Sequence, residues 1–131
     1  MRHQDWQLRF SDFGKARASM PFGWGSNDCC TFAAAAVKAL TGADPMVSVP
    51  SYDSASTAAR MIEEGGGLEQ LASSFLGQPV PVAMAAVGDI VLVLNANRQM
   101  LGVCNGTNVL APGEAGMAVL GMDAALAAWK I

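Results

Sequence analysis

Hydrophobic side chains recur at helical spacing through the first half of the chain. Trp6, Phe10 and Phe13 fall at positions i, i+4 and i+7, which predicts a helix over Gln4–Ala18 with an aromatic side packed on the core. The next apolar segment, Asp28–Leu40, has almost no polar side, and a helix of that kind is buried against several neighbours. The pattern therefore predicts two N-terminal helices, the second of them largely buried.

Glycine and serine mark where the next helices begin and end. Gly42 suits a left-handed cap at the end of the second helix. Ser54 can cap a third helix over Ala55–Glu64, and a short fourth helix is expected over Leu68–Leu76. The Gly65–Gly67 stretch between these helices lacks the lysine and the preceding strand of a phosphate-binding loop, so we interpret it as a turn.

Short apolar runs separated by turns characterise the second half of the chain. A last short helical turn is expected over Ala124–Trp129, where Asp123 can cap it. Helices followed by an antiparallel sheet are typical of the α+β class, and no repeat or linker divides residues 1–131, so we expect a single domain. The expected strands are Ile90–Leu94, Met100–Cys104, Asn108–Ala111 and Met117–Leu120.

Composition narrows the class of protein. Hydrophobic residues make up 52% of the 131 residues and charged residues 15%, which argues against disorder. The formal net charge of −3 gives no basic patch, so nucleic acid is not an expected partner. No apolar run approaches the length of a membrane span, and no signal sequence is evident. We therefore expect a soluble chain made in a cytoplasm.

The three cysteines do not form an evident disulfide or metal-binding pattern. Cys29 and Cys30 are adjacent and point in different directions on a helix, so they are poor disulfide partners for each other. These two residues, Cys104 and the sole histidine, His3, have no C-x-x-C spacing that would place two thiolates on one ion. We expect reduced thiols, no metal and no cofactor.

The segment Pro21–Ala36 carries the candidate chemistry. It is a loop rich in glycine and aromatic residues that runs through Ser26, Asn27 and Asp28 into the apolar helix. Side chains of these types cap the free N–H groups at the start of a helix. Cys29 follows in the first turn, where the positive end of the helix dipole favours a thiolate. The segment is typical of a cysteine-nucleophile site.

Several short motifs in a fixed order resemble the NlpC-type branch of the papain-like cysteine peptidase superfamily. The first segment of that family matches Trp24-Gly25 and Asp28-Cys29, and the second matches Gly88-Asp89-Ile90-Val91 and Gly102–Gly106. Over nearly its whole length, the chain more closely resembles a group of short phage tail proteins. Their P-F-x-W-G-x-x-D-C, T-G-x-D-P and A-W-x-I motifs correspond to Pro21–Cys29, Thr41–Pro45 and Ala128–Ile131. The resemblance implies a papain-like single domain with N-terminal helices on a small antiparallel sheet.

The resemblance places the nucleophile but not its base. It puts Cys29 at the nucleophile position and Met100 where the family has its histidine, and the third polar member falls near Ala111–Gly113. Neither methionine nor proline accepts a proton, and loss of a positioned base typically lowers the rate by roughly 10²–10⁴-fold. Asp28 would oppose the thiolate through its charge. His3 would have to fold back to the site to replace the base.

Two interpretations therefore remain. The favoured one is a structural component of a phage tail tip or baseplate with a degenerate cysteine-peptidase-like site, found in the virion and bound to other tail-tip or hub proteins. Phe22, Trp24 and Asp28 are then candidate interface or site-loop residues, with the aromatic side chains exposed. The alternative is an active cysteine peptidase or amidase of the tail that cleaves peptidoglycan peptide. It uses Cys29 and a histidine from position 3 or from another subunit.

Overall fold

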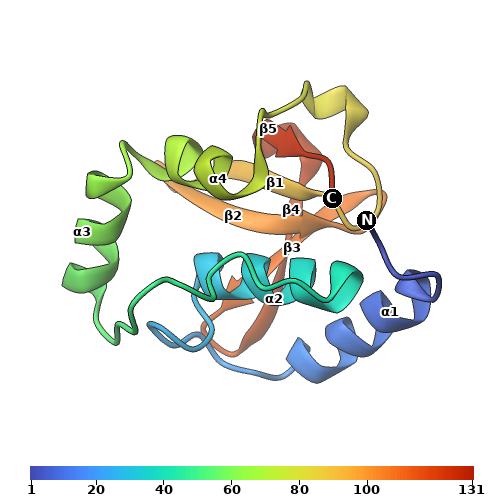
Figure 1. The fold of residues 1–131 in the computed structure, drawn as a ribbon, viewed down its shortest axis with the longest axis horizontal. Coiled ribbons are helices and arrows are strands. Elements are labelled where there is room, and N and C mark those ends of the chain that lie inside the picture. Colours follow the sequence, from blue (N-terminus) through green and yellow to red (C-terminus); the bar gives the residue numbers. More distant parts are fainter.

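A computed structural model describes residues 1–131, and it begins with the helices that the sequence pattern predicts (Figure 1). The four α-helices are α1 (Trp6–Arg17), α2 (Cys29–Thr41), α3 (Ala55–Glu64) and α4 (Leu68–Leu76). Two short 3₁₀ turns are present: η1 (Val82–Met84) follows α4, and η2 (Met122–Ala124) precedes the last strand. The expected bounds of α3 and α4 are confirmed, and α1 and α2 begin and end within two residues of their expected bounds.

One antiparallel sheet forms the second half of the chain. Its strands are β1 (Ile90–Asn95), β2 (Arg98–Cys104), β3 (Asn108–Gly113), β4 (Gly116–Gly121) and β5 (Ala125–Trp129). Their order across the sheet is β4-β3-β2-β1-β5. The α+β class and the single compact domain are thereby confirmed, as is each of the four expected strands, with bounds slightly longer than the hydrophobic runs.

The expected helical turn over Ala124–Trp129 is wrong. These residues form β5, which pairs with β1 so that Ile90 lies opposite Trp129 and Val91 opposite Ala128. Asp123 lies inside the η2 turn that precedes the strand, and its side chain caps no helix. Alanine has the highest intrinsic helix propensity, but pairing with the buried strand β1 overrides that local preference.

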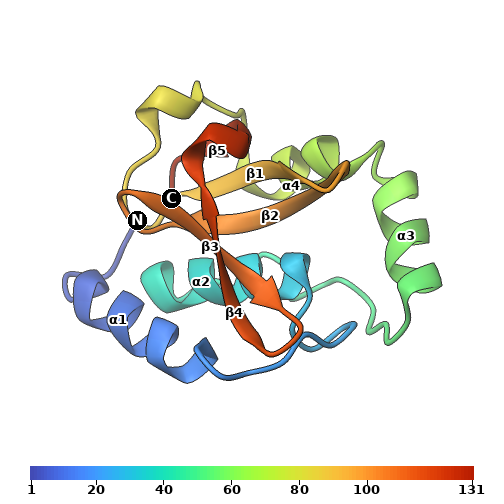
Figure 2. The same cartoon turned by 180° about the vertical axis from the view of Figure 1, so that it is seen from behind.

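Two clusters of buried hydrophobic side chains pack against the sheet, one on each face. The larger cluster lies between the sheet and the helices α2 and α4, with Phe32, Ile90 and Trp129 fully buried at its centre. Figure 1 shows α2 and α4 over the same side of the strands, whereas Figure 2 shows the opposite side without a long helix over it. That opposite side carries a smaller cluster around Val91 and Val93. Alternate residues of β1 therefore face different clusters, as the strand period requires.

The buried carboxylate of Asp89 joins the two ends of the chain. Its Oδ1 accepts hydrogen bonds from Arg2 Nη2 and from the Ile131 backbone N–H, each at 3.0 Å. Its Oδ2 accepts from Lys130 Nζ at 2.5 Å and from the Ala86 N–H at 2.9 Å. Figure 1 accordingly shows the N- and C-termini side by side. The Gly88-Asp89 motif therefore has a structural role at the start of β1.

No helix of the structure is both long enough and apolar enough to cross a membrane.

Candidate functional site

The start of α2 is fixed by a capping box. Asp28 Oδ1 accepts a hydrogen bond from the Thr31 N–H at 2.9 Å, and the Thr31 hydroxyl oxygen accepts from the Asp28 N–H at 2.9 Å. The other carboxylate oxygen of Asp28 accepts from the Gly25 N–H at 2.8 Å. Asp28 is only 2% exposed, so its carboxylate serves the loop and the helix from inside the protein. The role observed for Asp28 is therefore to hold Cys29 at the first position of α2.

The loop before Cys29 is held by hydrogen bonds from Arg17 and Asn27 and by close packing against the connector between α2 and α3. Arg17 Nη1 donates to Asn27 Oδ1 at 2.7 Å, and the buried Asn27 amide donates to the Met20 and Pro21 carbonyls. Gly25 has φ +78°, and a Cβ there would lie 1.7 Å from the Tyr52 carbonyl oxygen. Only glycine allows the loop to lie this close to the connector between α2 and α3.

Phe22 and Trp24 are half-buried rather than exposed as expected. Their rings make an edge-to-face contact with centroids 4.8 Å apart and planes at 86°. The part of each ring that remains accessible is still available to a partner, but the pair also stabilises the loop.

The Cys29 thiol is half-buried at the helix start, beside three groups that affect its ionisation. The Cys30 thiol and the Leu101 backbone N–H lower the pKa of Cys29, against the opposing effects of burial and of the Asp28 charge. The same pairing and burial raise the pKa of Cys30. Asp28 opposes the thiolate, as expected, but it does not dominate. Cys29 is therefore the first of the two thiols to ionise, and all three cysteines are free.

Tyr52, the only tyrosine of the chain, also reaches this site. Its hydroxyl is buried and has no hydrogen-bond partner. Burial, together with the neighbouring Asp28 carboxylate, raises the pKa of Tyr52, so the phenol stays protonated and cannot act as a base. The sequence pattern did not indicate Tyr52, because it lies in an irregular connector far along the chain from Cys29.

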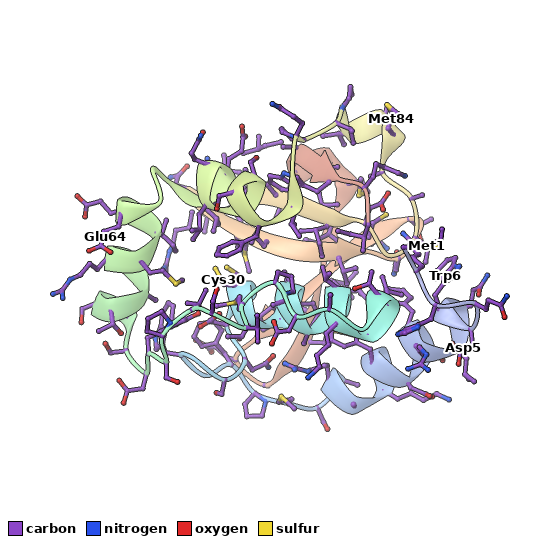
Figure 3. The ribbon with its side chains drawn as sticks, viewed as in Figure 1. Met1, Asp5, Trp6, Cys30, Glu64 and Met84 are labelled. Carbon is purple, nitrogen blue, oxygen red and sulfur yellow. The ribbon has the colours of Figure 1, made fainter.

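The other residues proposed for catalysis are not brought to Cys29. The backbone N–H of His3 donates to the Leu40 carbonyl oxygen at 2.7 Å, which fixes it at the C-terminal end of α2. An axial rise of about 1.5 Å per residue places Leu40 roughly 16 Å from Cys29. Figure 3 shows the same separation: Cys30 lies at one end of α2, and Met1 and Asp5, which flank His3, lie at the other.

The strand positions that would carry the base are also unsuitable. Met100 packs with the smaller cluster, on the side of the sheet away from α2, whereas Leu101 belongs to the cluster that contains Cys30. Pro112 is buried within β3. The site therefore has a thiol with a lowered pKa, a capping carboxylate and a protonated phenol, but no side chain that could take up a proton from Cys29 and return it to a leaving group. No group of three or more His, Cys, Asp or Glu side chains is placed to hold a metal ion.

Fold and site together define a small α+β domain with a cysteine at the start of its central helix. The whole chain, residues 1–131, matches the family described as a domain of unknown function, DUF6950, and the protein belongs to that family. No curated protein matches the chain.

Proposed function

We propose that this protein is a structural component of a bacteriophage tail tip, with a papain-like fold whose cysteine site has lost its catalytic function. The order of its short motifs, which resemble those of phage tail proteins and of the NlpC-type peptidases, supports the proposal. The arrangement of a cysteine at a helix start facing an antiparallel sheet agrees with that resemblance.

The missing base is the observation that carries the proposal. The only histidine is held at the far end of α2, and Met100 lies on the other side of the sheet. A thiolate alone can attack a carbonyl once, but without an acid to protonate the leaving group it does not turn over efficiently. This chemistry fits a protein that keeps the fold and the cysteine position for architecture.

The motifs that resemble those of tail proteins have structural roles in this fold. Gly42, with φ +82°, ends α2 through its N–H to the Lys38 carbonyl, and Asp44 accepts from the Met46 N–H at 2.9 Å. The fully buried Trp129 donates from Nε1 to the Ser73 hydroxyl at 3.2 Å. These motifs fix helix ends and the last strand, so they support a resemblance in fold rather than in catalysis.

The second candidate function is an active peptidase or amidase that cleaves peptidoglycan peptide. The lowered pKa of Cys29 favours it, because the thiolate is the form that attacks. The base must then come from another subunit, since this chain places none beside the thiol.

Substitutions in the phage distinguish the two functions. A structural role predicts that Cys29→Ala leaves particle assembly and infectivity unchanged, whereas Trp24→Ala reduces assembly. Phe75→Ala, at an exposed aromatic on α4, serves as the control for loss of an aromatic surface. Thermal unfolding of each purified variant separates an interface defect from a folding defect. Intact particles that lose wall cleavage on Cys29→Ala would instead support the peptidase.

A further inference from the structure

An open cleft lies on the side of α2 away from the sheet. Its volume is about 670 Å³, and its walls are the end of α1, α2 and the connector over residues 44–52. The charged residues that line it are Arg17, Lys38 and Asp44. Asp44 already accepts the Met46 N–H, so two cations and one engaged carboxylate face the cleft. Its charge is thus opposite in sign to the net charge of −3 of the whole chain.

The two cations have no acidic partner in the chain. The ion pairs of the structure are Arg2–Asp89, Lys130–Asp89 and Arg9–Asp5. Arg17 uses one nitrogen on the Asn27 amide, and its guanidinium carbon lies 5.6 Å from the centroid of the Phe13 ring. A half-buried guanidinium without a carboxylate partner is incompletely compensated for its loss of water. Lys38 is exposed and also unpaired.

The C-terminal turn of α3 has the complementary charge. Glu63 and Glu64 are both exposed, take part in no ion pair and lie at the negative end of the helix dipole, where acidic side chains are unfavourable. Ala58 is the only residue of α3 that is fully buried, and Figure 3 shows Glu64 on the outer side of this protruding helix. The one cation of α3 is Arg60, which is exposed and forms no ion pair with either glutamate.

We propose that the cleft beside Arg17 and Lys38 binds the acidic turn of α3, Glu63–Glu64, from a second copy of this chain. Charge complementarity selects this occupant, because the unpaired charges of the cleft and of the α3 turn are opposite in sign. Ala58 anchors α3, and its acidic end lies about 14 Å along the helix from the connector that forms the cleft wall, so the turn does not fill its own cleft. Contact between two copies relieves both unfavourable arrangements.

The proposed contact joins two different surfaces, so it is heterologous. Repetition of such a contact closes a ring if the rotation between copies divides a full turn, and otherwise produces a filament. The inference does not depend on the proposed role in a tail, because association of the purified chain tests it directly.

Association is measured by light scattering coupled to size exclusion and by sedimentation velocity, over a range of concentrations. Wild-type protein is expected to associate at about 0.1 M salt and to dissociate at about 1 M, since the screening length falls from about 10 Å to about 3 Å. Lys38→Glu and Glu64→Lys are each expected to weaken association by at least about tenfold, because like charges then face each other.

A mixture of the two variants provides the sharpest test. The lysine introduced at position 64 of one variant meets the glutamate introduced at position 38 of the other. The unchanged cleft also meets the unchanged acidic turn, so the mixture is expected to associate more strongly than either variant alone. Lys15→Glu and Glu114→Lys change the charge equally at exposed positions outside both surfaces and serve as controls. A monomeric wild type, equal effects of the controls, or no recovery in the mixture would each overturn the proposal.

Discussion

Replacement of Asp89 by asparagine tests the physical account of the fold at its most connected residue. The Asp89 side chain is fully buried and accepts four hydrogen bonds, two of them from the charged groups of Arg2 and Lys130. Asparagine keeps one acceptor oxygen and presents an NH₂ group where the other oxygen was. Two donors then lose their acceptor, and the negative charge between two cations is removed.

The expected loss of stability follows from burial. Removal of one partner from a buried ion pair costs about 3–5 kcal/mol. The Arg2 side chain is only 17% exposed, whereas that of Lys130 is 47% exposed and regains water more easily. The lower end, about 3 kcal/mol, is therefore expected for Asp89→Asn. In a domain of this size that corresponds to a fall in Tm of roughly 10 °C.

Thermal and urea unfolding of the purified protein measure the effect. The matched control is Asp5→Asn, which removes an ion pair to Arg9 of 2.7 Å between two side chains that are half exposed. Exposed pairs contribute little, so Tm should barely change in this control. Equal, small changes in both variants would refute the argument that the Asp89 carboxylate joins the ends of the chain.

Three further predictions follow from the site. Tyr52→Phe should raise stability by about 1 kcal/mol in urea unfolding, because it removes a buried hydroxyl without a partner; a loss of stability would show that the hydroxyl is hydrogen-bonded. Gly25→Ala should lower stability by at least about 3 kcal/mol, because its Cβ meets the Tyr52 carbonyl. The control Gly14→Ala, in an open helical position, should raise stability by about 0.5–1 kcal/mol; similar effects of the two would refute the close approach. Iodoacetamide should label Cys29 before Cys30 and Cys104, with a midpoint below the ordinary value of about 8.5, since its lowered pKa gives thiolate at lower pH; a midpoint at or above that value would contradict the proposed environment.

The sequence pattern predicted most of the helices and strands, because their local capping and hydrophobic signals agree with the burial of the same residues in the fold. Ser54 forms the predicted cap, with its hydroxyl oxygen accepting the Thr57 N–H at 3.2 Å, and the glycines at 65–67 end α3. The β-branched runs become strands whose alternate residues face the two clusters. The error at Ala124–Trp129 arose because an alanine-rich segment favours a helix locally, whereas pairing with the buried strand β1 determines its conformation in the fold.

The candidate site was predictable only where it is local. The cap at Asp28 and the position of Cys29 on the first turn of α2 follow from neighbouring residues. The approach of Tyr52, the hydrogen bond from Arg17 to Asn27 and the side of the sheet that Met100 occupies all depend on how distant segments pack. A motif alone therefore assigned Met100 to the base position without showing that this side chain points away from the thiol.

Hydrolysis of peptidoglycan tests the central claim, a cysteine site without a base, most directly. Purified protein and phage particles, the assembly expected from the proposed tail role, are each incubated with peptidoglycan with and without Cys29→Ala, and newly released amino groups are measured over time. Particles are included because they contain the neighbouring subunits from which a base would have to come. We expect no release of amino groups that depends on Cys29 in either preparation. Sustained release that disappears on Cys29→Ala would contradict it and establish an active peptidase or amidase.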